Sequence, residues 1–281
     1  MSRENALHAP PARARLRPYT TQTAHELSDH LFHALAGQSQ GDAARVWLEA
    51  ALADAARPEA SQSGVLLAHH ARAARYLRRV HTELQPALHR SLFRRGVHAP
   101  HAWSTVDCAR VLLALTALSR LPMHAHVAYV RQLFLKGDGD ERRALLQGLV
   151  LLPEPIRFTE LAIEACRSSV RWVFDAIAAD NTFPARWFPD VAFHQLVLKA
   201  LSVGLPIERI VGLDERFTFD LGRMVTEYAS ERRAAGRAVS PDTQALLSRL
   251  PEVSQEESPI APLHTLTPLM GAFQPLGDTA S

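Results

Sequence analysis

A lysine in an otherwise uncharged stretch is the first candidate for chemistry. Lys199 lies in the segment WFPDVAFHQLVLKALSVG, residues 187–204, and is the only formally charged residue between Val191 and Gly204. The whole chain has two lysines against 29 arginines, so an ammonium group at this position needs an explanation. Burial among apolar residues lowers the pKa of a lysine, and such an amine can act in a Schiff base or as a general base.

Polar groups that could complete a site flank this segment. The upstream loop DNTFPARWFPD and the downstream segment IVGLDERFTFDLGR supply amide, guanidinium, aromatic and carboxylate groups: Asn181, Arg186, Trp187 and Asp214. On the helix itself, Gln195 shares a narrow polar strip with Lys199, and His194 lies at its edge. The structural alternative is that Lys199 pairs with Asp214 or Glu227 and fixes the packing of the last helices.

A basic segment is the second candidate. RAARYLRRVHTELQPALHRSLFRR, Arg72 to Arg95, holds seven arginines and one acid, Glu83, around an apolar stripe of leucine and valine. Such a helix can contact an anionic membrane surface or an acidic partner, and it can also be a core stripe with a solvated arginine face. Nucleic acid is not expected as a partner, because base-stacking aromatics and a helix-turn-helix pattern are missing.

The spacing of the histidines predicts no metal site, and the absence of the common cofactor motifs predicts no cofactor. A helical metal site needs ligands three or four residues apart, whereas His124 and His126 are two apart and His69 and His70 are adjacent. The chain has no GxGxxG, P-loop or GxSxG pattern.

The elements that must position these residues are helices. Apolar residues recur at helical spacing, turn signals follow every 12 to 20 residues, and the period-two pattern of strands is missing. We expect helices in DCARVLLALTALSR, in HAHVAYVRQLFLK, after a cap at Asp138 or Asp140, after Pro155, and from Asp190 to Gly204. A longer basic helix is expected from about Val65 to Gly96, with a kink or break at Pro86.

The predicted fold class is all-α. The helices are short and arrive as pairs, which suggests stacked antiparallel pairs as in HEAT or armadillo arrays; an irregular helical bundle is the alternative. We predict a disordered segment over residues 1–18, a helical region with the basic helix over 19–103, a continuous helical core over 104–250 and a disordered Pro/Ser-rich tail over 251–281.

Composition and charge indicate a soluble protein. The chain is 47% hydrophobic and 21% charged, and its longest apolar runs are about half of the ~20 residues that cross a bilayer. The formal charge is +2, with residues 1–103 at +5 and residues 104–281 at −3. Cys108 and Cys166 lie in apolar segments without ligand spacing, so we expect reduced thiols and a cytoplasmic location.

The C-terminal half carries a resemblance. The segments LLPEPIRFTELAIEACRSSVRWVFDAIAADN and FPARWFPDVAFHQLVLKALSVGLPIERIVGLDER, with Glu231 and Arg232 on the last long helix, resemble the EboA family of bacterial secondary-metabolite gene clusters. The resemblance covers roughly Arg110 to Leu250. The sequence departs from the family pattern with Asn181-Thr-Phe-Pro184 in place of Asn-Pro-Tyr-Pro, and with His194 in place of an asparagine.

Two functions follow from these observations. The first is a non-enzymatic scaffold or adaptor in biosynthesis or trafficking of a secondary metabolite, which binds other proteins of the same gene cluster or a small metabolite. The second is an enzyme or a metabolite-binding module centred on Lys199. A lysine without a matched acid-base partner favours the scaffold. The candidate ligand-binding residues are Asn181, Arg186, Trp187, His194, Gln195, Lys199, Asp214, Glu227 and Arg232.

Overall fold

The computed structural model describes residues 41–57, 64–80 and 86–250, together with residues 27–29, 31–33 and 35. Within these ranges the chain is helical and contains no sheet, so the all-α prediction is confirmed. A single antiparallel bridge joins Val97 to Asn181. The α-helices are α2 (Asp42–Ala55), α3 (Val65–Tyr76), α4 (Pro86–Arg94), α5 (Thr105–Arg120), α6 (His126–Lys136), α7 (Gly139–Gly148), α8 (Thr159–Cys166), α9 (Arg171–Ala178), α10 (Phe183–Trp187), α11 (Asp190–Val203), α12 (Phe219–Ala234) and α13 (Pro241–Leu247).

Several helices begin and end at residues whose side chains favour a boundary. Ser104 and Asp138 form capping boxes with the third residue of α5 and α7, in which side chain and backbone bond reciprocally. Asp138, not Asp140, is therefore the cap of α7. The helix α11 ends where Gly204 adopts the left-handed conformation, with φ of 67°, that glycine accepts without steric cost. The predicted span of this helix is confirmed.

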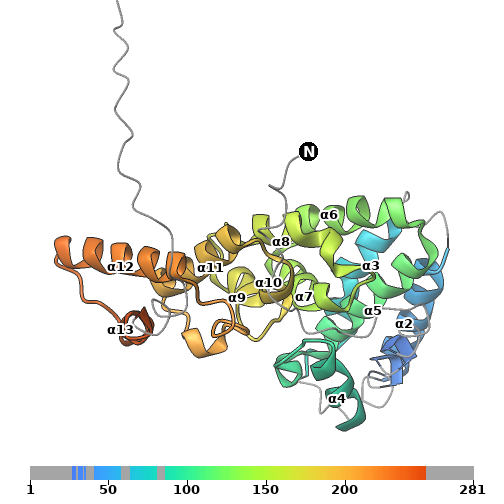
Figure 1. Cartoon of the computed structure of the whole chain (residues 1–281). Coiled ribbons are helices and arrows are strands. Elements are labelled where there is room, and N and C mark those ends of the chain that lie inside the picture. Colours follow the sequence, from blue (N-terminus) through green and yellow to red (C-terminus); the bar gives the residue numbers. More distant parts are fainter. Residues whose placement is uncertain are drawn as a thin grey trace, which may run out of the picture.

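The helices form a layered stack (Figure 1). Helix α7 packs between α5 and α9, while α6 packs on α7 and α8 packs on α9 as a second layer. Toward the C-terminus, α11 packs on α12 and α12 on α13; at the opposite end α2, α3 and α5 all contact one another. The middle of the chain is thus an array of stacked pairs, and α2, α3 and α5 cluster at the N-terminal end of the stack.

The core runs through the whole stack. Buried apolar residues from Leu27 to Leu246 form one contiguous cluster, in which Trp103, Phe158, Phe174, Phe183, Phe188 and Phe193 are the bulkiest of the fully buried apolar members. Residues 104–250 are therefore packed together with the region that precedes them. The two predicted disordered segments, 1–18 and 251–281, lie outside the described residues.

The basic helix ends earlier than its predicted kink or break at Pro86, so its continuous span from Val65 to Pro86 is wrong. Helix α3 ends at Tyr76, and Leu77 is extended with φ of −103° and ψ of 134°, so residues 77–80 are not helical. A new helix, α4, starts at Pro86, whose ring suits the first turn of a helix and not its interior. Leu77 and Leu92 are buried, but Val80 is 44% exposed, so the apolar stripe does not lie on one surface.

In the part of the chain that the structure describes, each helix is too short or too polar to cross a membrane.

Candidate functional site

Lys199 binds the end of a neighbouring helix. Its Nζ donates to the carbonyl oxygens of Cys166, at 2.5 Å, and Ser168, at 2.7 Å, and lies 4.7 Å from the centre of the Phe174 ring. Cys166 is the last residue of α8, where carbonyls lack partners within the helix and carry partial negative charge. The ammonium group therefore caps α8 and holds the turn between α8 and α9 against α11.

The predicted ion pair of Lys199 with Asp214 or Glu227 is wrong. Asp214 accepts from Arg249 at 2.5 Å, and its side chain is 80% exposed. Glu227 accepts from Arg223, one turn earlier on α12, at 2.8 Å. A lysine can satisfy its donors with backbone carbonyls as well as with carboxylates, and the sequence does not distinguish the two.

Arg186, Trp187 and His194 on α10 and α11 also have structural contacts. The guanidinium of Arg186 lies 6.0 Å from the ring of Trp187, and burial lowers the pKa of this arginine. His194 is buried with Nε2 3.2 Å from the hydroxyl of Thr218, and burial lowers its pKa as well. Gln195 is exposed on α11, which is thus less completely buried than its apolar sequence suggests.

Asn181 and Arg232 bind backbone groups. Asn181 Nδ2 donates to the carbonyls of Leu146, at 3.2 Å, and Ala176, at 3.1 Å, and Oδ1 accepts from the amide of Phe183 at 2.9 Å. Arg232 Nε donates to the carbonyl of Ala238 after the end of α12. The structure therefore distributes the nine candidates over several contacts and does not gather them around Lys199.

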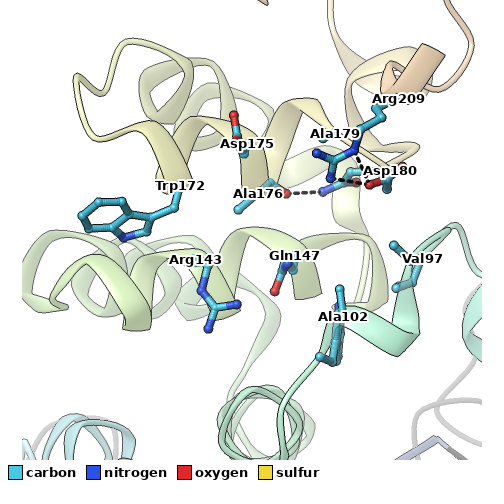
Figure 2. Close-up of a pocket in the computed structure, with 13 residues that line it drawn as sticks. Val97, Ala102, Arg143, Gln147, Trp172, Asp175, Ala176, Ala179, Asp180 and Arg209 are labelled. Atoms are coloured by element: carbon cyan, nitrogen blue, oxygen red, sulfur yellow. Dashed lines mark hydrogen bonds and ion pairs between the residues drawn. The ribbon is translucent and has the colours of Figure 1, made fainter. Parts of the chain in front are cut away.

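A cleft lies beside Asn181. Helices α7 and α9 form one side, residues 97–103 form the other, and Figure 2 shows the side chains that point toward it. Its volume is about 130 Å³. It is lined by Val97, Ala99, Ala102, Trp103, Arg143, Gln147, Trp172, Asp175, Ala176, Ala179, Asp180, Asn181 and Arg209. Asn181 is the one predicted site residue among them.

The charged groups of the cleft have opposite charges beside them. Arg143 donates to Asp107 at 2.9 Å, and Arg209 donates to Asp180 through Nε at 2.9 Å and through its terminal nitrogen at 2.6 Å. Asp175 accepts from Arg171 at 2.7 Å. The fixed charges around the cleft are therefore compensated within the protein.

Two lining residues stand apart from these pairs. The side-chain oxygen of Gln147 is shielded from water and has no hydrogen-bond partner among the described residues. Trp172 is 54% exposed, which is unusual for the largest apolar side chain, and lies against Gly139 at the start of α7. A buried acceptor without a donor and an exposed indole are both features that a bound molecule would relieve.

Arg143 connects the cleft to a buried charged network. Its partner Asp107 is 1% exposed and also accepts from the hydroxyl of Ser104 at 2.7 Å. On the same helix Arg110, also 1% exposed, donates to the carbonyl of His70 and lies 3.8 Å from Glu141. Burial raises the pKa of Glu141 and lowers that of Arg110. These contacts fix α5 against α3 and α7 and make the wall of the cleft rigid.

Comparison with known proteins identifies the family. The family model described as metabolite traffic protein EboA matches residues 27–248. The chain belongs to the EboA family. The match begins well before Arg110, so most of the N-terminal region, which the sequence resemblance left out, is part of the EboA fold. No curated protein and no solved structure matches the chain.

The cleft of this EboA protein could have been suspected from helical spacing. Arg143 and Gln147 are four residues apart on α7, and Trp172, Asp175 and Ala176 follow one face of α9. The other wall consists mainly of small apolar residues in residues 97–103, which carry no chemical signal. The cleft therefore appears only when the two helices and this segment are brought together.

The histidine-rich segments of the EboA chain contribute to packing. His69 Nε2 lies 2.8 Å from Asp54 on α2, and His70 is buried with its pKa lowered to about 3, mainly by burial. His126 bonds through Nε2 to the carbonyl of Leu121 at 3.1 Å. Among the described residues, three or more metal-ligating side chains are not found together.

Proposed function

We propose that this EboA protein is a non-enzymatic helical scaffold or adaptor in metabolite traffic that holds a small molecule in the cleft between α7, α9 and residues 97–103. The cleft is the observation that carries the proposal. It is a concave surface on which small apolar side chains and two indoles alternate with six polar or charged side chains, and such polar groups can fix the orientation of a bound small molecule. The family description supplies the metabolite.

The contacts of Lys199 support a scaffold. Its amine donates to two backbone carbonyls and lies over an aromatic ring, so the group is used to join α8, α9 and α11. A general base or a Schiff-base amine needs a lone pair directed at the substrate. The ammonium of Lys199 directs its protons at the protein.

The wider setting of this role is part of the same proposal. The cargo is a secondary metabolite, and the partners are other proteins encoded in the same gene cluster. Exposed arginines of the Arg72–Arg95 segment, among them Arg72, Arg75 and Arg90, would meet an acidic partner or an anionic membrane surface. Cys108 and Cys166 form no disulfide, which supports a role in the reducing cytoplasm.

A cleft-filling variant tests the proposal. Ala102 is exposed on the wall formed by residues 97–103, so Ala102→Phe should occupy the cleft without disturbing the core. In the native host we expect this variant to lose delivery of the gene cluster's product. The Tm of the purified variant should lie within ~2 °C of that of the parent. Ala128→Phe, at an exposed alanine on α6, is the matched control and should support normal delivery. Normal delivery by the Ala102→Phe protein would reject the cleft as the functional site.

A further inference from the structure

The cleft has two ends with different chemistry. Gly139, which lies against Trp172, and Gln147 are eight residues apart on α7, and a helix rises 1.5 Å per residue, so the two ends are about 12 Å apart. Figure 2 shows Trp172 of α9, followed by Arg143 and Gln147 of α7, in this order along the length of α7. A single ring cannot touch both ends, so an occupant of the whole cleft must be elongated.

The end at Gln147 has small side chains and two amides, of which Asn181 is already bonded to backbone groups and the oxygen of Gln147, among the described residues, is not. Ala102, Ala176 and Ala179 leave room there because their side chains stop at Cβ. The total volume of the cleft, about 130 Å³, is close to the ~150 Å³ of an engineered apolar cavity that binds benzene, so the cleft encloses one ring and the rest of a longer ligand lies along its open mouth toward Trp172. The last torsion of a glutamine side chain is soft, so the unpaired oxygen of Gln147 can turn toward a donor at low cost. This end suits a flat group with an N–H or O–H at its edge.

The charged side chains of the cleft disfavour a charged occupant. The guanidinium of Arg143 is held by Asp107, and Arg209 and Asp175 each have an oppositely charged partner. An anionic or cationic ligand would have to displace one of these groups or leave its own charge unpaired away from water, and both cost free energy. An uncharged ligand meets neither cost.

We propose that the cleft binds an uncharged, flat and elongated molecule about 12 Å long, with an N–H or O–H donor at Gln147 and a ring or other apolar end against Trp172. The exposed indole of Trp172 then gains a stacking partner at the mouth of the cleft. This inference rests on the proposed function in using the same cleft, but it specifies the chemical class of the ligand.

A set of simple probes tests the class directly. Phenol has the ring and the donor, 4-phenylphenol adds a second ring that reaches toward Trp172, and 4-phenylbenzoate replaces the donor with a negative charge. Binding to the full chain is measured by titration calorimetry or by ligand-observed NMR. We expect 4-phenylphenol to bind with a Kd of about 0.1 mM, at least ten-fold more tightly than phenol. We expect 4-phenylbenzoate to bind at least ten-fold more weakly than 4-phenylphenol.

Variants at the two ends should act differently. Gln147→Leu keeps the volume of the side chain and removes the amide, so it should weaken phenol and 4-phenylphenol by a similar factor of five or more. Trp172→Ala should weaken only 4-phenylphenol, because phenol does not reach that end. Gln195→Leu and Phe219→Ala, at an exposed glutamine on α11 and an exposed phenylalanine on α12, are the matched controls and should change neither affinity.

Three results would overturn the ligand class: equal affinity for the charged probe, no effect of Gln147→Leu, or equal weakening of both phenols by Trp172→Ala. The proposed function has its own readout in the delivery of the product by the Ala102→Phe protein. If that variant abolishes delivery while no probe binds, the ligand class is wrong and the functional cleft stands. If the probes bind as expected and Ala102→Phe delivers normally, the ligand class stands and the proposed function is wrong.

Discussion

Replacing Lys199 with methionine removes a helix cap while keeping the volume of the stem. Two hydrogen bonds from a charged donor are lost, each about 1.5–3 kcal/mol, together with a cation–π contact of about 0.5–1 kcal/mol. Lys199 is only half-buried, so water will partly replace these contacts. We therefore expect Lys199→Met to lower the free energy of unfolding by about 2–4 kcal/mol, which for a folded region of this size corresponds to ~5–15 °C in Tm.

The chain offers a close control for this variant. Lys136, the only other lysine, is exposed at the end of α6, so Lys136→Met should change stability by less than about 0.5 kcal/mol. Asp214→Asn should be equally mild, because that carboxylate is exposed and pairs with Arg249. Urea unfolding followed by circular dichroism measures all three and the Lys199→Met, Asp214→Asn double variant, which should be additive. A Lys199→Met protein as stable as the parent, or a stabilising coupling with Asp214→Asn, would refute the capping role.

Three further measurements test the packing around the cleft. Gly96→Ala places a Cβ 2.0 Å from the Thr182 hydroxyl at φ of +102°, so it should lower the free energy of unfolding by more than about 2 kcal/mol. Gly204→Ala, at φ of +67° with no atom within 4 Å, should lower it by about 1 kcal/mol. Equal losses of stability in thermal melts would contradict the close contact at Gly96. His70 is neutral when folded, with a pKa lowered to about 3 from 6.5, so the unfolded chain alone takes up this proton between those values and stability falls as pH is lowered through this window. In urea titrations, the free energy of unfolding should therefore fall between pH 6 and pH 4 by about 2 kcal/mol less for His70→Gln than for the parent. Identical decreases for the two proteins would count against a buried neutral imidazole. A double-mutant cycle on Asp107 and Arg143 should give a coupling free energy of about 2 kcal/mol, and the same cycle on the exposed pair Arg223 and Glu227 should give less than about 1 kcal/mol. A larger coupling for the exposed pair would be inconsistent with the burial of Asp107.

The helices that the sequence predicts well are those whose ends have local signals. Asp138 starts α7 and Gly204 ends α11, and in both cases a side-chain oxygen or a missing Cβ acts within a few residues along the chain. The basic segment fails for the opposite reason. Its apolar stripe continues past Tyr76, but the backbone leaves the helix at Leu77, and the hydroxyl of Thr105, the first residue of α5, donates to the carbonyl of Arg78. Periodicity along one segment carries no information about such a distant partner.

The site was harder to predict because its contacts join side chains to backbone. The composition and spacing around Lys199 suggest a carboxylate partner, yet its acceptors are carbonyls 31 and 33 residues earlier in the chain. Main-chain acceptors occur at every residue, so no residue type marks them. The cleft has the same difficulty, since four alanines form part of its wall and its polar side chains come from separate segments of the chain.

The abundance of arginine follows from the architecture. A stack of short helices exposes many helix ends, and each end has carbonyls that need donors. Arg142 donates to Phe134 and Leu135 near the end of α6, and Arg216 donates to Pro184 and Ala185 in α10.

The contact between α9 and α11 uses this device in both directions. Arg171, the first residue of α9, donates to the carbonyls of Val203 and Gly204 at the end of α11, while Lys199 on α11 donates to the end of α8 just before α9 begins. Helix α9 thus supplies a cation to the C-terminal carbonyls of α11, and α11 supplies one to the C-terminal carbonyls of α8. A cation is favourable at a helix C-terminus because the carbonyls there carry partial negative charge. Because Arg171 also binds Asp175, which lines the cleft, this reciprocal contact holds α9 in the position that the cleft requires. Lys199 therefore affects the cleft by fixing the helix that forms its wall, without being part of the site itself.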